Sequence, residues 1–115
     1  MKNKKYILRI RSADKDIFDA IRNGKKKIET RAATIKYQKI KKGDDVILIC
    51  GKSKLQKKIA HAHIYKTITD LLKKYTPQDI HQNLKSQEEL EKLYYSFPGY
   101  QEKIKQHGLI ALELI

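Results

Sequence analysis

A chain of 115 residues is long enough for one hydrophobic core, and its 40% of hydrophobic residues exclude a disordered chain. No apolar run approaches the length that crosses a bilayer, so we expect no membrane segment and a cytoplasmic protein. The 26 Lys and Arg residues outweigh 13 Asp and Glu residues, which gives a formal net charge of +13. Such a field attracts polyanions, chiefly nucleic acid, although a lysine-rich proteome would produce the same excess.

The N-terminal segment predicts a strand and then an amphipathic helix. Residues 4–11 alternate between apolar and polar positions, which indicates a half-buried strand. Ser12 or Asp14 is placed to cap the helix, and Gly24 is placed to end it. The apolar stripe of this helix consists of Ile17, Phe18 and Ile21.

Three further strands are predicted in the middle of the chain. Residues 26–31 form a short β-compatible stretch, and residues 32–42 are irregular and basic. A turn at Gly43 leads into an apolar strand over residues 46–50. A longer strand over residues 55–68 places four side chains on one face, namely Ile59, His61, His63 and Tyr65.

The C-terminal part predicts helices followed by one last strand. A short helix follows Thr69 and ends before Pro77, and a second begins at the capping box of Ser86. After the Phe97-Pro98-Gly99 turn, residues 100–106 allow at most two helical turns. The stretch 109–114 is apolar nearly throughout, as is typical of a central strand.

This order of elements predicts an α+β fold. We expect a small mixed β-barrel of about five to six strands, with one helix after the first strand and a helical insertion before the last strand. A ferredoxin-like sandwich is the disfavoured alternative, because the second helical block is too long and broken. We treat residues 1–115 as a single domain.

The motif Gly24-x-Lys26-x-x-Glu29-x-Arg31 lies where the helical pattern ends and the extended pattern begins. Strand alternation puts Glu29 and Arg31 on one face and Thr30 on the other. A carboxylate beside an arginine fixes the planar guanidinium, which then suits a phosphate or the edge of a base. The alternative is a surface salt bridge of little energetic value.

This octapeptide resembles the signature of the ASCH domain, a branch of the PUA-like barrel superfamily. The Gly43-Asp44 turn, the helical insertion and the Phe97-Pro98-Gly99 turn are also similar, and the resemblance runs from about Tyr6 to Leu114. It implies a PUA-like barrel that binds RNA or a nucleotide. Some members of the family are amidohydrolases that deacetylate N4-acetylcytidine, and a ribonuclease activity also occurs.

The amidohydrolase reaction matches this chain only in part. In those enzymes the position of Glu29 is a threonine nucleophile, whereas the lysine is retained as Lys26. Their catalytic glutamate falls near Gln82–Asn83, where this chain has no acid, and Asp79 is the nearest carboxylate. A hydrolase of modified nucleosides or of RNA, with Lys26 and Glu29 as its catalytic residues, is therefore the alternative to a binding module.

The expected ligand is RNA, a nucleotide or a nucleoside, with no cofactor and with a monomer as the default state. The candidate binding residues are Gly24, Lys26, Glu29, Arg31, Arg9, Arg11, Lys36, Tyr37, His61 and His63. The two histidines lack a recognisable third ligand, so we expect no metal and place them on the wall of the barrel or pocket. Two roles stay open for an aromatic cluster, packing of the insertion or stacking of bases, and its members are Tyr94, Tyr95, Phe97 and Tyr100.

Overall fold

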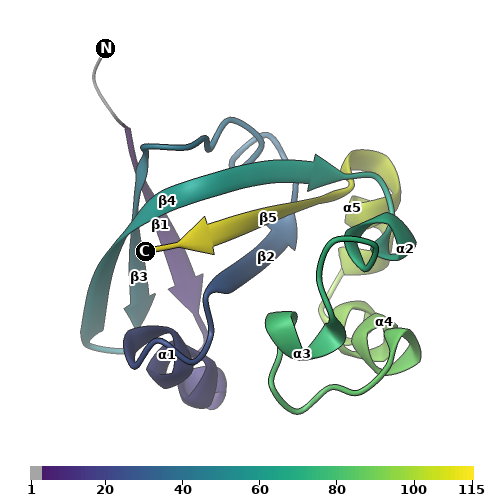
Figure 1. Cartoon of the computed structure of the whole chain (residues 1–115), viewed down its shortest axis with the longest axis horizontal. Helices are drawn as coiled ribbons and strands as arrows, with labels where there is room; N and C mark the ends of the chain where they lie inside the picture. The colour runs from purple at the N-terminus through teal and green to yellow at the C-terminus, as the bar shows by residue number, and fades with distance from the viewer. Residues whose placement is uncertain (1–3) are drawn as a thin grey trace.

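Five strands form one strongly curled sheet in this computed structural model, which describes residues 4–115 (Figure 1). The order across the sheet is β1-β3-β4-β5-β2, with β1 and β3 parallel and the other pairs antiparallel. The strands are β1 (Lys5–Ile10), β2 (Ile28–Ala32), β3 (Asp45–Cys50), β4 (Ser53–Tyr65) and β5 (Leu109–Leu114). The helices are a 3-10 turn (Ser12–Asp14), α1 (Lys15–Arg22), α2 (Ile68–Leu71), α3 (Pro77–Ile80), α4 (Gln87–Ser96) and α5 (Tyr100–His107).

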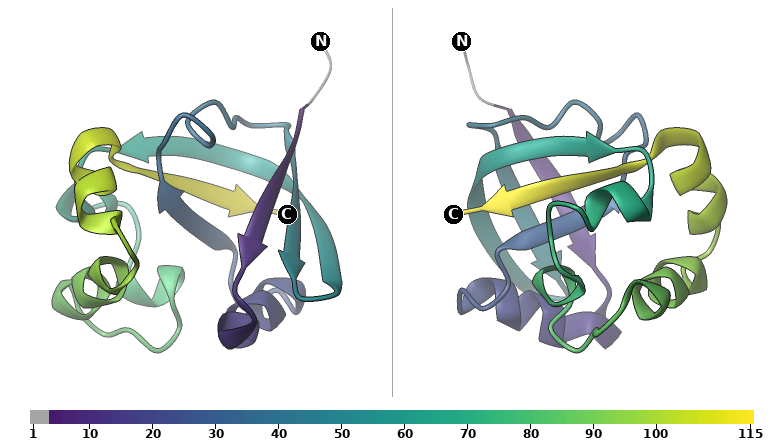
Figure 2. Two further views of the ribbon diagram at one scale, coloured as in Figure 1. Left: turned by 180° about the vertical axis from the view of Figure 1, so that it is seen from behind. Right: turned by 45° about the vertical axis from the view of Figure 1, so that its right-hand side comes forward.

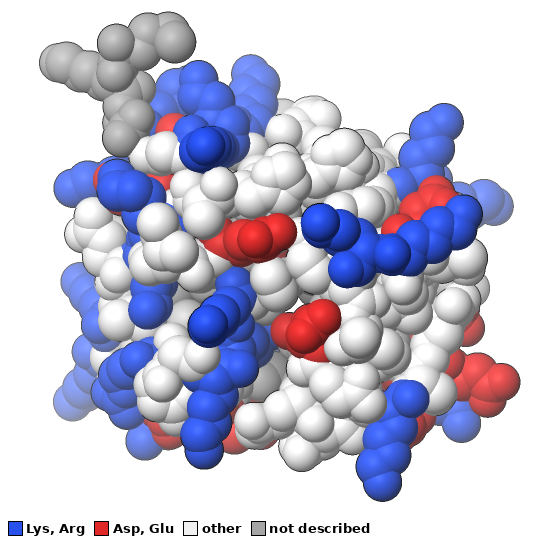
Figure 3. Space-filling model, viewed as in Figure 1, with Lys and Arg blue, Asp and Glu red and all other residues white. Residues whose placement is uncertain are grey.

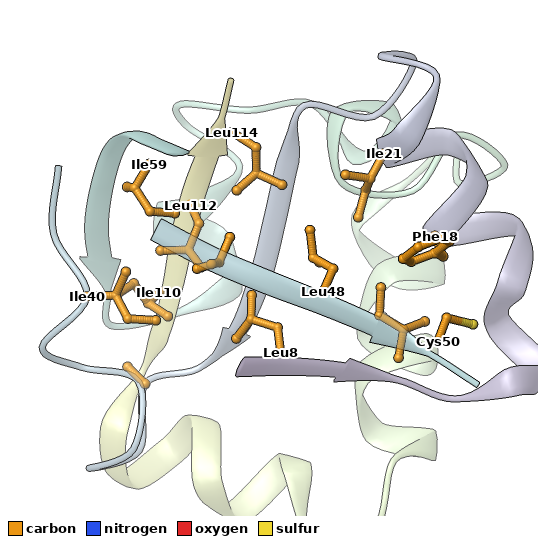
Figure 4. Packing of buried hydrophobic residues seen from close by; sticks show 13 residues of the cluster. Leu8, Phe18, Ile21, Ile40, Leu48, Cys50, Ile59, Ile110, Leu112 and Leu114 are labelled. Carbon is orange, nitrogen blue, oxygen red and sulfur yellow. The ribbon is translucent and has the colours of Figure 1, made fainter. Parts of the chain in front are cut away.

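The concave side of the sheet holds the main hydrophobic core. Alternate residues of β1 and β3 face inward, because successive side chains of a strand point to opposite faces. Phe18 and Ile21 of α1 are fully buried against them and close one end of the barrel (Figures 1 and 4). The members labelled in the close view are Leu8, Phe18, Ile21, Ile40, Leu48, Cys50, Ile59, Ile110, Leu112 and Leu114.

A second apolar cluster joins the helical insertion to the convex side of β2 and β5. The four helices α2–α5 gather on one flank of the sheet, away from β1 and β3 (Figure 2). Their buried side chains include Leu71, Leu90 and Ile104, which pack with Leu109 and Ala111 of β5. The two clusters cover both faces of β5, which explains its nearly continuous apolar sequence. Because β5 lies between β4 and β2, the prediction of a central last strand is confirmed.

The expected PUA-like mixed barrel is therefore confirmed, with a helix after the first strand and a helical insertion before the last strand. Among residues 4–115, no helix combines the length and the apolar character that a membrane crossing requires.

Two details of the predicted helices were wrong. The predicted side-chain cap of α1 is absent, because the Asp14 carboxylate accepts a hydrogen bond from Arg11 Nε at 2.8 Å instead. The insertion holds four helices rather than two or three. Pro77, expected only to stop a helix, occupies the first turn of α3, where a proline needs no N–H partner, and Thr76 and Asp79 form the capping box there.

A β-bulge overturns the predicted faces of β4. The register shifts between Ile59 and His61, so one extra residue turns the following side chains over. Ile59 is fully buried in the core, and Ala62 packs against the same core. His61 and His63 are exposed on the convex side, so the prediction that they share a face with Ile59 and line the barrel was wrong.

Candidate functional site

The motif begins at the tight turn between α1 and β2. Gly24 has a φ of +83°, a left-handed conformation that glycine adopts without strain, so the chain reverses directly after α1. The Lys26 N–H then donates to the Ala20 carbonyl of α1 at 2.9 Å. This bond fixes the start of β2 against the helix and brings Lys26 to the base of the strand.

The pairing of β2 with β5 decides where the motif side chains point. Glu29 lies opposite Leu112 and Arg31 opposite Ile110, two residues of the main core, so both face the concave side. Thr30 lies opposite Ala111, which belongs to the cluster under the insertion. The predicted alternation is confirmed.

Three charged side chains converge at this place with very little exposure. Arg31 Nη2 lies 3.1 Å from Glu29 Oε2, and Lys26 Nζ lies 3.9 Å from Glu29 Oε1. The exposed fractions of the Lys26, Glu29 and Arg31 side chains are 8%, 10% and 15%. A solvent-exposed salt bridge, the alternative considered from the sequence, is therefore wrong. Two cations beside one anion leave a net positive charge, which a ligand anion can neutralise and to which a base acceptor can hydrogen-bond.

Burial and neighbouring charges shift the pKa values of both cations. Burial lowers the pKa of Lys26, Glu29 opposes that shift, and Arg31 adds to it. The Lys26 ammonium also donates to the Ile80 carbonyl at the end of α3. Burial acts to lower the pKa of Arg31 as well, but Glu29 outweighs it with help from Tyr37 and Tyr100, and the pKa is raised.

Arg31 also joins the two edges of the sheet. Its Nη2 donates to the Arg9 carbonyl of β1 at 2.9 Å, across the gap between the edge strands β1 and β2. Its guanidinium lies 5.8 Å from the ring of Tyr37, at cation–π distance. The planar guanidinium is thus held in one orientation, as the sequence pairing with Glu29 predicts.

A cavity of about 260 Å³ opens at this gap. Its polar side consists of Lys26, Glu29, Thr30 and Arg31 from β2 and its approach. The other walls come from β1 and α1 and from the insertion, and they consist of Arg9, Ile10, Arg11, Asp14, Ile17, Ile80, His81, Leu93, Tyr94, Phe97, Pro98 and Tyr100. An apolar, aromatic wall facing a few convergent polar groups is the usual character of a small-molecule site.

Thr30 lies in this cavity although it points to the opposite side of β2 from Glu29. The cavity wraps around the free edge of the strand, so both faces of β2 line it. The Thr30 hydroxyl is hydrogen-bonded to the Tyr94 hydroxyl, and the Tyr100 hydroxyl accepts from the Ala32 N–H at 3.4 Å. Burial raises the pKa of Tyr94, which keeps its hydroxyl protonated. The sequence identifies Tyr94 as part of an aromatic cluster, but no local pattern predicts its hydrogen bond with Thr30.

The aromatic cluster of the insertion serves both packing and the cavity. Tyr94 is 3% exposed and belongs to the cluster under the insertion, while Phe97 and Tyr100 pack against that cluster and line the cavity. Arg11 lies 5.1 Å from the Phe97 ring. Tyr95 is 42% exposed and does not line the cavity.

Several residues predicted for the site lie outside the cavity. Gly24 forms the turn between α1 and β2. The Tyr37 ring lies at cation–π distance from Arg31 but does not line the cavity. Lys36 is exposed beside the Tyr37 ring, at 5.4 Å. His61 and His63 lie on the convex side of β4, and among residues 4–115 no group of three side chains offers a metal site. Arg9 and Arg11 do line the cavity, as predicted.

The catalytic set expected for the deacetylating branch of the resembled family is not reproduced here. Two carboxylates line the cavity, Glu29 and Asp14, and Asp14 is paired with Arg11 at 2.8 Å. Asp79 caps α3 through Thr76 instead of facing the cavity. The region where the family glutamate falls contributes Ile80 and His81 to the wall.

Similar proteins are known for nearly the whole chain. The family model of the ASCH domain matches residues 12–115. The crystal structure of the hypothetical protein PH0355 is similar, with a TM-score of 0.82 and 31% sequence identity over 96% of each chain. Protein PF0455 from Pyrococcus furiosus, solved by solution NMR, is similar with a TM-score of 0.72 and 25% identity over 96% of this chain and 94% of that chain. No curated protein matches the chain.

Proposed function

The chain belongs to the ASCH domain family, and on that premise we propose that it binds RNA or a nucleotide by holding one base or nucleoside in the cavity beside β2. One observation carries the proposal, the convergence of the nearly buried side chains of Lys26, Glu29 and Arg31 in a single cavity. A solvated ion pair would need no such enclosure. The volume of about 260 Å³ is just below the range of about 300–1,000 Å³ for drug-sized ligands, so it favours one base or nucleoside over a larger group.

The cavity offers complementary groups to a nucleotide. The Nε and Nη2 groups of Arg31 are engaged by Glu29 and Arg9, which leaves the Nη1 donors without a hydrogen-bond partner in residues 4–115. Glu29 supplies acceptors for an amino group of a base. The rings of Phe97 and Tyr100 supply an apolar wall against which a base can stack. Arg9 adds positive charge at the end of β1 for a phosphate, beside the ion pair of Arg11 and Asp14.

Affinity measurements on variants test this proposal. Isothermal titration with cytidine monophosphate and with a ten-nucleotide single-stranded RNA is compared for wild type, Arg31→Ala and Lys26→Met. The exposed Arg22, which is paired with Asp19 on α1, provides the matched control Arg22→Ala. We expect each cavity variant to weaken binding at least about tenfold, since a charge-assisted hydrogen bond is worth about 1.5–3 kcal/mol. Equal affinities for wild type and both cavity variants would remove the site.

A hydrolase of modified nucleosides is the second candidate, favoured by the 3.9 Å approach of Lys26 Nζ and Glu29 Oε1 in the cavity. Glu29 would accept a proton from the attacking water and return it to the departing N4 amine of cytidine as the C–N bond breaks, and Lys26 would stabilise the negative oxygen that develops from the amide carbonyl. Purified protein is incubated with N4-acetylcytidine and with single-stranded RNA, and Glu29→Gln serves as the isosteric control. Turnover that exceeds the control supports the hydrolase, whereas equal rates leave binding alone.

We further propose that residues 1–115 act as one ASCH domain, because β5 contributes side chains to both apolar clusters. A monomeric state and a cytoplasmic location stay predictions. Sedimentation of the purified protein tests the first, and localisation of a tagged chain tests the second.

A further inference from the structure

The convex side of β4 carries a row of ring side chains that the cavity does not use. Beyond the bulge, His61 and His63 are exposed and Tyr65 is half-buried, and all three project from the same side of the strand. We call these three residues the β4 ridge. The residues that line the cavity beside β2 include none of them, so the ridge is a separate feature.

The imidazole rings of His61 and His63 are nearly parallel, and we call the space between them the slot. Their planes differ by only 3°, and their centroids are 6.4 Å apart. That separation is nearly twice the rise of about 3.4 Å between successive bases of a strand. Parallel rings at this centroid distance leave room for one flat base between them. The spacing follows from β geometry, since residues two apart on a strand lie about 6.8 Å apart.

The ridge has a rigid base at one end. The Tyr65 ring meets His63 edge-on, with centroids 4.8 Å apart, and the Tyr75 ring meets Tyr65 in the same manner at 6.2 Å. The Tyr75 hydroxyl donates to Glu113 Oε2 of β5 at 2.6 Å. These contacts hold the aromatic end in place, so the slot is not formed by freely rotating side chains alone.

Positive charge flanks the ridge. Lys54 and Lys58 are exposed on the first half of β4, and Lys66 follows Tyr65 directly. Lysine and arginine gather over the half of this face that carries the start of β4 and α1 (Figure 3). Asp45 is paired with Lys58 at 3.2 Å, and Glu113, which lies opposite His61 on β5, accepts a hydrogen bond from the neutral Tyr75 hydroxyl. Exposed lysines thus lie before and after the rings along the chain, where a backbone of phosphates can follow them.

We propose that the β4 ridge is a second contact surface, which takes single-stranded nucleic acid by stacking one base between His61 and His63 while the backbone follows the flanking lysines. Stacking on ring side chains accepts any base, because every base has a π-face. The ridge therefore adds length-dependent, sequence-tolerant affinity to a chain whose cavity holds one nucleotide. Its occupant is a strand of several nucleotides and not a free mononucleotide.

The test uses a ten-nucleotide adenine oligomer in ribose and deoxyribose forms, with 2-aminopurine at its centre. Fluorescence reports stacking of that base, and anisotropy of an end label reports affinity. The double variant His61→Ala/His63→Ala should lose about five- to 150-fold in affinity for both oligomers, together with the quenching of 2-aminopurine. The exposed His107 at the end of α5 gives the matched control His107→Ala, which should bind as wild type.

Two further variants separate stacking from charge and from the cavity. His61→Phe/His63→Phe should keep the affinity within about threefold, whereas His61→Lys/His63→Lys should not restore it. Binding of cytidine monophosphate should be unchanged in all ridge variants, so a failure of the cavity and a failure of the ridge are read separately. Wild-type affinity of the double alanine variant, or full rescue by lysine, would overturn the proposal. Because both histidines are exposed, the single variants His61→Ala and His63→Ala supply folded proteins for the same comparison if the double variant does not fold.

Discussion

Lys26 offers a positive charge to a ligand, but burial of that charge lowers the stability of the folded protein. Its ammonium is nearly buried, and burial lowers the pKa of Lys26 below its ordinary value of 10.5. The unfolded chain therefore holds this proton more tightly than the folded chain does. A buried charge of this kind is maintained at a cost to folding, which is typical of a residue kept for a ligand.

Replacement of Lys26 by methionine should stabilise the fold at neutral pH. Each unit by which the folded-state pKa is lowered corresponds to about 1.4 kcal/mol, and below that pKa the cost is present in full. As the pH rises through the lowered pKa towards 10.5, wild type loses the charge and the advantage of Lys26→Met should shrink. Urea unfolding of both proteins at pH 6, 8 and 10 measures the difference. A variant that is less stable than wild type at every pH would contradict this sign.

The hydroxyl pair of Thr30 and Tyr94 predicts a strong energetic coupling. Both residues are buried, and their hydroxyls bond one another. Thr30→Val or Tyr94→Phe alone leaves one hydroxyl without its partner, which we expect to cost about 1–3 kcal/mol. The double variant should cost less than the sum of the two, because both polar groups are gone. A double-mutant cycle by chemical denaturation checks this, and strict additivity would show that the bond contributes nothing.

At the scale of elements, two glycines with similar φ angles have different roles. Gly108 opens β5 at a φ of +77°, and a Cβ there would lie 2.4 Å from the Tyr65 carbonyl oxygen. Gly24 has a φ of +83°, but a Cβ there would meet nothing within 4 Å. The close approach at Gly108 is what lets β5 begin beside the end of β4.

Gly108→Ala should therefore destabilise the protein much more than Gly24→Ala. Gly24→Ala pays only the left-handed backbone cost, about 1–2 kcal/mol, whereas Gly108→Ala adds a clash with backbone and should exceed about 3 kcal/mol. Thermal unfolding of the two variants gives the comparison. Equal destabilisation would mean that the contact with Tyr65 relaxes at no cost.

The elements also show what the sequence could and could not predict. Hydrophobic periodicity located β1, α1 and β5 because each buries a regular face or both faces. The bulge in β4 has no such signal, since Ala60 looks like any other strand residue, and one inserted residue reversed the side to which His61 and His63 point. The motif named Lys26, Glu29 and Arg31 correctly as neighbours.

The remaining part of the site depends on long-range packing. Ile80, Tyr94 and Tyr100 approach β2 only when the insertion folds back, and the contact between Thr30 and Tyr94 spans 64 residues of sequence. The exposure of a strand edge likewise depends on sheet order, which local patterns do not specify. Strand alternation alone therefore places Thr30 away from the site, whereas the cavity wraps around the edge of β2 and includes it.

At the scale of the whole molecule, the net charge of +13 predicts salt-sensitive binding of long strands. If a ten-nucleotide RNA makes about four phosphate contacts, its affinity should fall about 50-fold between 50 and 200 mM salt. Lys54→Gln/Lys58→Gln should lower the slope of log affinity against log salt by about 1.4, since each single-strand contact contributes about 0.7. Lys73 in the turn after α2, whose side chain is 75% exposed, provides the control Lys73→Gln. If wild type, Lys54→Gln/Lys58→Gln and Lys73→Gln had the same slope, the phosphates of the RNA would not contact Lys54 and Lys58.

Occupation of the cavity beside β2 is tested most directly by amide NMR of the wild-type protein during titration with cytidine monophosphate. Binding there should shift the signals of residues 26–31 together with those of His81 and Tyr94, which line the cavity from the insertion. These groups come from three separate stretches of the chain, so their joint response would locate the ligand between them. Shifts confined to the exposed lysines, with the signals of residues 26–31 unchanged, would contradict nucleotide binding at the motif.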